Sequence, residues 1–173
     1  LFYISKKTID DPKKYELLSM GMDGVNKRNP NDGGKLPTSF DEYQIVEPND
    51  IIFCLYDVDE TPRTVGISKI EGMITPSYTI VKCFDGVLPD YIFHLYLLID
   101  SQKGLKPFYT GLRNTIRPET FMDIEVVIPK YEDQLKITKK MAGFNKMLKL
   151  EYERIKTLKQ MEVPFLYKTL LEI

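Results

Sequence analysis

The hydrophobic pattern of this 173-residue chain changes near Pro129. Before that position, short apolar runs are separated by Gly, Pro, Asn and Asp, which is typical of strands joined by turns. After it, apolar residues recur every three or four positions, which is the period of an amphipathic helix. We therefore predict two parts, a globular domain over residues 1–130 and a helical segment over residues 131–173.

The clearest strand signal in the first part is Ile51–Tyr56, an apolar run rich in branched side chains. Pro89 is expected to open a helix that is apolar nearly all round and therefore buried. Strands and short helices mix without a regular βαβ order, so the pattern predicts an α+β domain with a mixed β-sheet. The remaining predicted segments are strands at Tyr15–Met20, Thr64–Ile67, Tyr78–Cys83 and Glu125–Ile128, a helical turn at Pro118–Met122 and an exposed loop at Asn26–Lys35.

The helical segment carries one apolar stripe. From Tyr131 to Met161 it has 31 residues, so the helix would be about 47 Å long, more than the roughly 35 Å diameter of a domain of this size. Part of the stripe should therefore pack on another helix, as in a coiled coil; a helix folded back on its own core is the alternative. Pro164 is expected to interrupt the stripe, with a final turn or two after it. The stripe consists of Ile137, Met141, Phe144, Leu148, Tyr152, Ile155 and Leu158.

Charge changes the picture of the first part. Residues 130–173 carry ten Lys/Arg and six Asp/Glu, whereas residues 1–129 carry fourteen and nineteen. An acidic domain argues against a general nucleic-acid binder, so any DNA contact must come from local patches. No apolar run is long enough to span a membrane. Cys54 and Cys83 lie in apolar runs without metal-ligand spacing, and we expect them to be reduced core residues.

Catalytic motifs are nearly absent. His94, the only histidine, lies within the apolar helix and has no partners that the sequence can name, so a core role is expected. Thr75-Pro-Ser-Tyr78 has the outline of a methyltransferase Asn/Asp-Pro-Pro-Tyr loop, but Thr75 cannot hold a base amino group. Asp90, Asp100 and Lys103 approximate a metal-nuclease pattern, but with the wrong spacing. We therefore expect no catalysis, no metal and no cofactor, and favour a recognition or scaffold role.

Basic and aromatic side chains near Gly and Pro turns provide the main recognition signal. Side chains of this kind on loops can reach phosphates and base edges. The set consists of Arg63, Lys69, Lys103, Lys106, Arg113, Asn114 and Arg117, interleaved with Tyr56, Tyr78 and Tyr109.

Five segments occur in an order that resembles a known family. Ile45–Tyr56 contains an Asp followed by a hydrophobic strand with Phe, Glu60–Ile67 contains Arg-Thr-Val-Gly, and Gly72–Tyr78 begins with Gly and ends with Tyr. Gly111–Ile116 has the sequence GLRNTI, and Ile128–Ile137 has the sequence IPKYEDQLKI. In this order they resemble the target recognition domain of type I restriction–modification specificity subunits, followed by the start of the conserved spacer helix. Asp133 stands where the family usually has Glu, and residues 1–44 match less distinctly.

The resemblance implies a cytoplasmic, non-catalytic subunit that binds double-stranded DNA. In this family, each of two recognition domains reads one half of a split site, and the long helices that follow them pair antiparallel. Methylation subunits dock on this framework, flip an adenine and transfer a methyl group from S-adenosylmethionine; a nuclease–translocase subunit joins for restriction. This chain would hold one recognition domain and one spacer helix. Its partner helix would belong to the same longer subunit or to a second copy.

Several loop residues in or beside the family-like segments are expected to contact DNA. For Arg113 the alternative to DNA contact is a salt bridge, and for Tyr78 it is core packing. The acidic run, Asp41, Glu42, Glu47, Asp50, Asp57, Asp59 and Glu60, is expected to face away from DNA or to meet the methylation subunit. The alternative function is a coiled-coil interaction scaffold whose globular head binds no DNA. The expected DNA contacts are Arg63, Lys69, Tyr78, Lys106, Arg113 and Asn114, and the expected helix-pairing residues are Ile137, Met141, Phe144, Leu148, Ile155 and Leu158.

Overall fold

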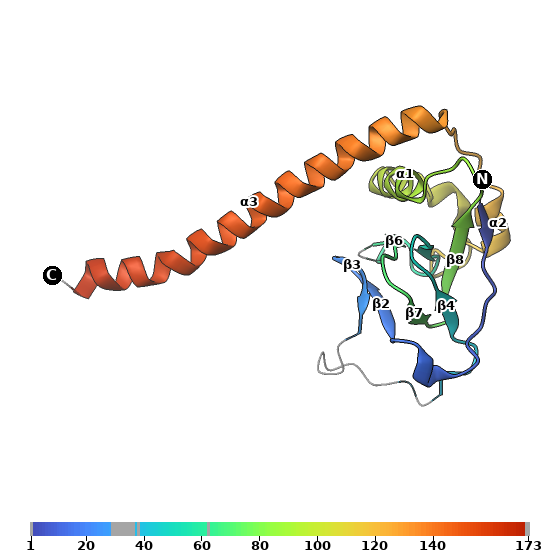
Figure 1. Ribbon diagram of the computed structural model, residues 1–173, viewed down its shortest axis with the longest axis horizontal. Helices are drawn as coiled ribbons and strands as arrows, with labels where there is room; N and C mark the ends of the chain where they lie inside the picture. The colour runs from blue at the N-terminus through green and yellow to red at the C-terminus, as the bar shows by residue number, and fades with distance from the viewer. Residues whose placement is uncertain (1, 29–36, 38, 62, 172–173) are drawn as a thin grey trace. The chain divides into compact units, whose positions relative to one another are not determined.

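The computed structural model describes residues 2–28, 37, 39–61 and 63–171, with side chains given up to residue 161. The chain divides into two compact units, Leu1–Gln134 and Leu135–Ile173, called here the N-terminal unit and the helical unit. Figure 1 shows the strands and short helices of the first and the single long helix of the second. The predicted α+β class is confirmed, and its ladders are antiparallel.

A four-stranded antiparallel sheet forms the centre of the N-terminal unit. Ile51, Ile52 and Phe53 of its middle strand are at most 1% exposed. Ile51 and Phe53 contribute to one apolar cluster and Ile52 to another, because alternate residues of a strand point to opposite faces. Burial on both faces explains why this strand is a continuous apolar run. The strand order is β1 (Phe2–Ile4), β8 (Tyr78–Cys83), β5 (Ile51–Cys54) and β6 (Val65–Ile67).

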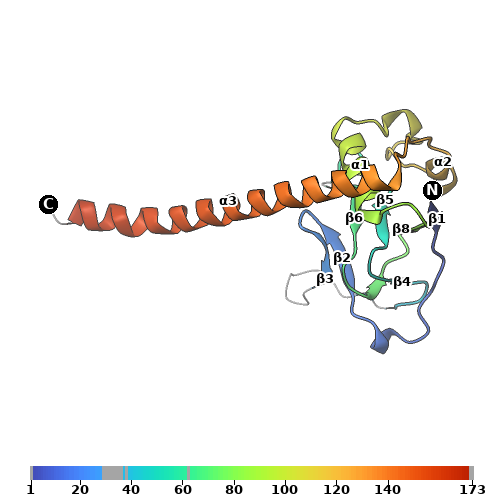
Figure 2. The same ribbon diagram turned by 45° about the horizontal axis from the view of Figure 1, so that its top comes forward.

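Two pairs of short strands cover the Ile52 face of the sheet (Figures 1 and 2). The segment before β2 and the start of β7 approach closely because Gly72 has no side chain. A Cβ at that position would lie 2.5 Å from the backbone oxygen of Glu16. A larger residue there would force the backbone of the two segments apart. The pairs are β2 (Leu18–Gly21) with β3 (Gly24–Lys27), and β4 (Gln44–Val46) with β7 (Gly72–Ile74).

Helices cover the opposite face of the sheet. They are α1 (Pro89–Ser101) and α2 (Pro118–Met122), each with proline in its first turn, as predicted. Tyr96 of α1 and Phe121 of α2 pack against Phe53 of β5, with ring centroids 4.9 and 4.5 Å from that of Phe53. The expectation that α1 is buried all round is wrong, because Leu98 is 54% exposed. Two 3-10 turns, Pro12–Lys14 and Lys106–Phe108, complete the helical elements.

The predicted strand at Glu125–Ile128 is absent. The segment is extended, and Ile124, Val126 and Ile128 pack against the α1 cluster while Val127 is 87% exposed. Extended chain alternates its side chains whether or not a neighbouring strand pairs with it. The alternating sequence therefore predicted which side chains of this segment are buried, but it wrongly predicted pairing with a neighbouring strand.

The long helix α3 runs from Tyr131 to Leu171. The separate final turns expected after Pro164 are not seen, since one helix continues through that position; the stripe beyond residue 161 lies outside the described side chains. An interior proline removes one backbone hydrogen bond, a cost of about 3 kcal/mol, but does not by itself reverse the chain direction. Among the described residues, no helix combines the length and the apolar content needed to cross a bilayer.

Several predicted boundaries were also wrong. The loop predicted at Asn26–Lys35 begins inside β3, and residues 29–36 lie outside the described part of the chain. The strand predicted from Tyr15 starts at Leu18. Four short strands, β1, β3, β4 and β7, each of three or four residues, had not been predicted from the sequence.

Candidate nucleic-acid interface

The loop between β5 and β6 forms the centre of the candidate interface. Thr61 folds this loop: its backbone N–H donates to the Asp57 oxygen at 2.8 Å, and its hydroxyl donates to the backbone oxygens of Tyr56 and Asp57 at 3.0 and 2.9 Å. These hydrogen bonds tie Thr61 back to Tyr56 and Asp57, and so fix the first part of the loop.

A second turn, Thr110–Thr115, is fastened to that loop. The N–H of Asp57 donates to the Arg113 oxygen at 3.0 Å, and the N–H of Ile116 donates to the Leu55 oxygen at 2.9 Å. Asn114 has a φ of 45°, a left-handed conformation that asparagine tolerates better than most residues. The side chain of Arg113 is exposed, and Asn114 is half-buried. These two predicted residues thus lie next to the β5–β6 loop.

Arg63 and Tyr78 share a small hollow beside the same loop. Tyr78 is the ladder partner of Cys54, and Arg63 leads into β6. Burial raises the pKa of Tyr78, so its hydroxyl remains a hydrogen-bonding group at neutral pH. The packing expected as an alternative for Tyr78 is partly realised, because the side chain is half-buried. The hollow, of about 90 Å³, is lined by Met20, Gly21, Met22, Cys54, Thr61, Arg63 and Tyr78.

The carboxylate of Asp59 is paired with two neighbouring side chains of the N-terminal unit. Lys103 Nζ lies 3.3 Å from Asp59 Oδ1, and the Tyr109 hydroxyl donates to the same oxygen at 3.3 Å. Burial, followed by the charge of Asp59, raises the pKa of Tyr109 to about 12. Lys106, on the 3-10 turn Lys106–Phe108, is exposed near this group.

The charge of these loops is opposite to that of the surrounding unit. Residues 55–63 and 102–117 together carry five Lys/Arg and three Asp/Glu, although residues 1–129 are acidic overall. Arg63, Lys106, Arg113 and Arg117 form no ion pair with any residue that the structure describes, so the salt bridge considered for Arg113 is not formed there. The result is a local cationic surface on an acidic domain.

Lys69 lies apart from this group. Arg63 precedes β6 and Lys69 follows it, so six residues of nearly extended chain, about 20 Å, separate them. Lys69 Nζ instead lies 3.0 Å from Asp90 Oδ1, at the start of α1. Of the six residues predicted to contact DNA, Arg63 and Tyr78 line the hollow beside the β5–β6 loop, and Arg113 and Asn114 lie on the turn bonded to that loop. Lys106 lies on the turn Lys106–Phe108, and Lys69 follows β6.

The acidic run predicted to face one way does not form a single face. Glu47 accepts hydrogen bonds from Lys7 and Lys82, each at 2.7 Å, and the buried Asp50 pairs with Lys82 at 2.5 Å. Asp59, by contrast, lies in the candidate interface. Members of this run thus lie before and after β5, and their orientation relative to DNA stays a prediction.

Gln134, which had no predicted role, ties the first turn of α3 to the loop before α1. Its side chain is 1% exposed. Its Oε1 accepts from the Leu88 N–H at 2.8 Å, and its Nε2 donates to the oxygens of Gly86 and Pro129 at 3.1 and 2.9 Å. A glutamine is suited to this position because it offers one acceptor and two donors. The only signal in the sequence was its place in the IPKYEDQLKI segment.

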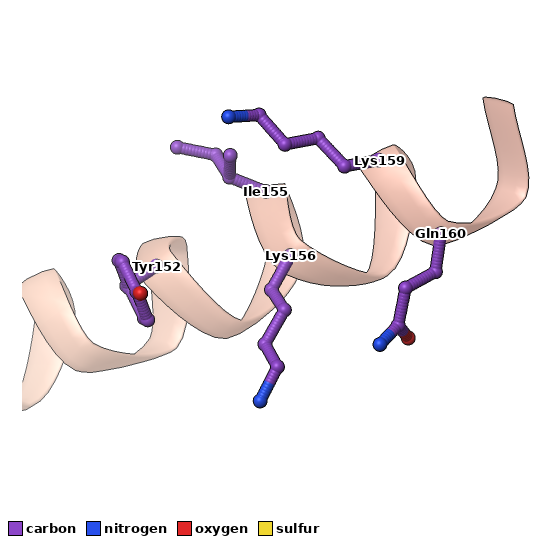
Figure 3. A pocket seen from close by; sticks show the side chains of 5 residues that line it. All are labelled: Tyr152, Ile155, Lys156, Lys159 and Gln160. Atoms are coloured by element: carbon purple, nitrogen blue, oxygen red, sulfur yellow. The ribbon is translucent and has the colours of Figure 1, made fainter.

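The apolar stripe of α3 forms a second candidate surface. Every described side chain from 142 to 161 is exposed. In Figure 3, Ile155 and Lys159 leave the helix on one side and Lys156 and Gln160 on another, because residues four apart share a side of a helix. The predicted pairing residues are exposed, with Met141 half-buried and the others ranging from Ile137 at 39% to Leu158 at 58%.

Comparison with known proteins gives one informative result. No family model and no curated protein sequence matches the chain. A chain from a solved structure of the type I R-M system, described for its complex assembly and conformational transition, is similar to this chain over 84% of its residues, with 10% identity and a TM-score of 0.55. The match covers 36% of the solved chain, so this chain spans about a third of its length. The chain thus has a fold related to that of a component of a type I R-M system.

Proposed function

We propose that this chain is a non-catalytic DNA-recognition module of a type I restriction–modification specificity subunit. The observation that carries the proposal is that two pairs of predicted residues meet the β5–β6 loop: Arg63 and Tyr78 line a hollow beside it, and Arg113 and Asn114 lie on a turn that is hydrogen-bonded to it. The fold related to the type I R-M system and the order of the family-like segments support the same function.

The chemistry of this surface suits a duplex. Arginine guanidinium groups can bind phosphates or make paired hydrogen bonds to guanine, and asparagine can pair with adenine in the major groove. Because the Arg113–Asn114 turn is hydrogen-bonded to the β5–β6 loop, these side chains approach DNA from a preformed backbone. A rigid presentation lowers the ordering cost of binding.

In this proposal the helical unit pairs with a second spacer helix, in the same subunit or in a second copy. For an antiparallel second copy centred on residue 146, Ile137 would face Ile155, and Phe144 would face Leu148. Such a pair buries apolar side chains that are exposed in the single chain. Methylation subunits would dock on this framework to methylate adenine, and a nuclease–translocase subunit would add restriction.

The test begins with co-purification of the chain with a methylation subunit, followed by mapping of the methylated adenines to define the DNA site. Arg113→Ala should then weaken binding of the complex to that site by about 1–3 kcal/mol and relax one position of the sequence. Lys13→Ala, which removes an exposed lysine from the turn Pro12–Lys14, is the matched control and should bind as wild type does. Unchanged binding of Arg113→Ala at several salt concentrations would overturn its assignment.

The second candidate function is a protein-interaction scaffold whose head binds no DNA. The observation behind it is the exposed apolar stripe of α3, which gains stability from a protein partner whether or not the head binds DNA. Salt separates the two functions. Affinity for a duplex falls steeply with salt, in proportion to the phosphates neutralised, whereas association through apolar side chains does not.

A further inference from the structure

Leu112, at the tip of the Thr110–Thr115 turn, is fully exposed. Its relative exposure is 105%, the highest among the large apolar side chains of the described residues. The next highest value, 87%, belongs to Val127 in an extended segment. An apolar side chain that projects completely into water gains free energy when another surface covers it.

Hydrogen bonds fix the backbone of the turn that carries this side chain. Thr110 and Thr115 exchange backbone hydrogen bonds of 2.8 and 3.1 Å, and the Thr110 hydroxyl donates to the Thr115 oxygen at 2.9 Å. Gly111 has a φ of 70°, a conformation that glycine adopts without strain. Together with the hydrogen bond from Asp57 to the Arg113 oxygen, these contacts make the turn a fixed projection.

The surroundings of the tip favour a nucleic acid over a protein as the occupant. Arg113 and Arg117 are exposed near Leu112, and Tyr56, beside the Asp57 that anchors the turn, is 52% exposed. Protein docking sites are broad apolar patches. A single apolar tip flanked by cations instead resembles the wedges that proteins insert between base pairs, with charges placed on the adjoining phosphates.

We propose that Leu112 is an apolar wedge that enters a base step of the DNA target and partly unstacks it. This inference rests on the proposed DNA recognition. Arg113 and Arg117 bind the phosphates beside the opened step. Pyrimidine–purine steps unstack most easily, so the wedge selects for such a step through DNA deformability as well as through base contacts.

The experiment uses the assembled complex and its mapped site, with 2-aminopurine placed in turn at each adenine of the site except the methylated ones, because the methylation subunits would flip those bases and brighten the probe without any wedge. Wild-type complex should raise the fluorescence at one step, because unstacking relieves quenching. Leu112→Ala should abolish this rise and weaken binding to the site roughly tenfold, while Leu112→Met should retain most of both effects. Val127→Ala removes a comparably exposed apolar side chain elsewhere and should behave as wild type does.

The outcomes separate the wedge from the proposed function. If wild-type complex binds its site and Arg113→Ala weakens binding, but no step brightens or Leu112→Ala leaves the signal intact, the wedge is overturned and DNA recognition stands. Loss of co-purification with the methylation subunit in Leu112→Ala would show that a protein covers the tip, which also overturns the wedge. Failure of the wild-type complex to bind any duplex would overturn both.

Discussion

The two units use apolar side chains in different ways. In the N-terminal unit, Phe53 and Phe121 are at most 1% exposed and belong to a continuous cluster between sheet and helices. In the helical unit, Phe144 and Leu148 are more than half exposed. Fully burying such a side chain is worth about 1.5–3 kcal/mol. The N-terminal unit is therefore stabilised by apolar side chains that its own chain buries. The stripe of the helical unit is stabilised in this way only when a partner covers it.

The largest expected effect tests this contrast with a matched pair of substitutions. Phe53→Ala should lower the free energy of unfolding of the N-terminal unit by about 3–5 kcal/mol, because it leaves a cavity among packed rings. Phe144→Ala should change the same quantity by less than about 0.5 kcal/mol but weaken self-association or pairing with a partner helix. Urea unfolding followed by near-ultraviolet circular dichroism of tyrosine gives the first quantity, and sedimentation gives the second.

An equal loss of unfolding free energy in both variants would contradict the comparison. The stripe would then contribute to the stability of the N-terminal unit, which is the folded-back alternative considered from the sequence. Equal sedimentation of Phe144→Ala and wild type at every concentration and in complexes would leave the stripe without a pairing role.

Gln134 lies at the boundary of the two units and should have an intermediate effect. Gln134→Ala leaves the Leu88 N–H and the Gly86 and Pro129 oxygens without their side-chain partner, at a cost of about 1–3 kcal/mol. Gln160→Ala, at an exposed position of the same helix, is the control and should be nearly neutral. An equal, small effect of both substitutions in urea unfolding would mean that water replaces these bonds without loss.

The sequence predicted those features whose signals are local. The Ile51–Cys54 strand, the proline-initiated helices and the periodic stripe of α3 each depend on a few neighbouring residues. The strands β1, β4 and β7 are short and are stabilised by partners distant in sequence, such as β8 for β1. Glu125–Ile128 is the opposite case: its sequence alternates as a strand's does, but it pairs with no other strand among the described residues.

The candidate interface was predictable residue by residue but not as an arrangement. Arg63 and Arg113 stood out as basic residues near turns, yet their grouping depends on the hydrogen bond between Asp57 and Arg113, 56 positions apart in the chain. Lys69 had the same local signal but follows β6 at its other end, where its Nζ lies 3.0 Å from Asp90 Oδ1. Local patterns identify suitable side chains, and the tertiary fold decides which of them lie together.

A smaller effect is expected inside the packed cluster. Among the described residues, the Tyr96 hydroxyl is the buried side-chain polar atom that lacks a hydrogen-bond partner. Its burial raises the pKa of Tyr96 to about 12, so the group stays neutral. Tyr96→Phe removes an unsatisfied buried group and should stabilise the N-terminal unit by about 1 kcal/mol. Lower stability of this variant in urea would show that the hydroxyl has a partner, such as a buried water.

The smallest expected effect is a pH dependence of the N-terminal unit that the helical unit should not share. Hydrogen bonds from Lys7 and Lys82 lower the pKa of Glu47 from 4.5 to about 2. Because the folded state binds this proton less readily, the stabilisation is complete above pH 4.5 and is lost as the pH falls toward 2. Its side chain is 40% exposed, so solvent screening limits the gain to less than about 1 kcal/mol.

Glu47→Gln should therefore lower stability slightly at neutral pH and flatten the stability profile between pH 4.5 and 2. Glu71→Gln, which replaces an exposed acid without an ion pair among the described residues, should keep the wild-type profile. Helix content measured at 222 nm as a function of pH reports mainly on α3 and should respond equally in both variants. If the free energy of unfolding of Glu47→Gln follows the same pH dependence as that of wild type, Lys7 and Lys82 do not hold Glu47 in solution. The ion pairs of Glu47 would then contribute nothing to the stability of the N-terminal unit.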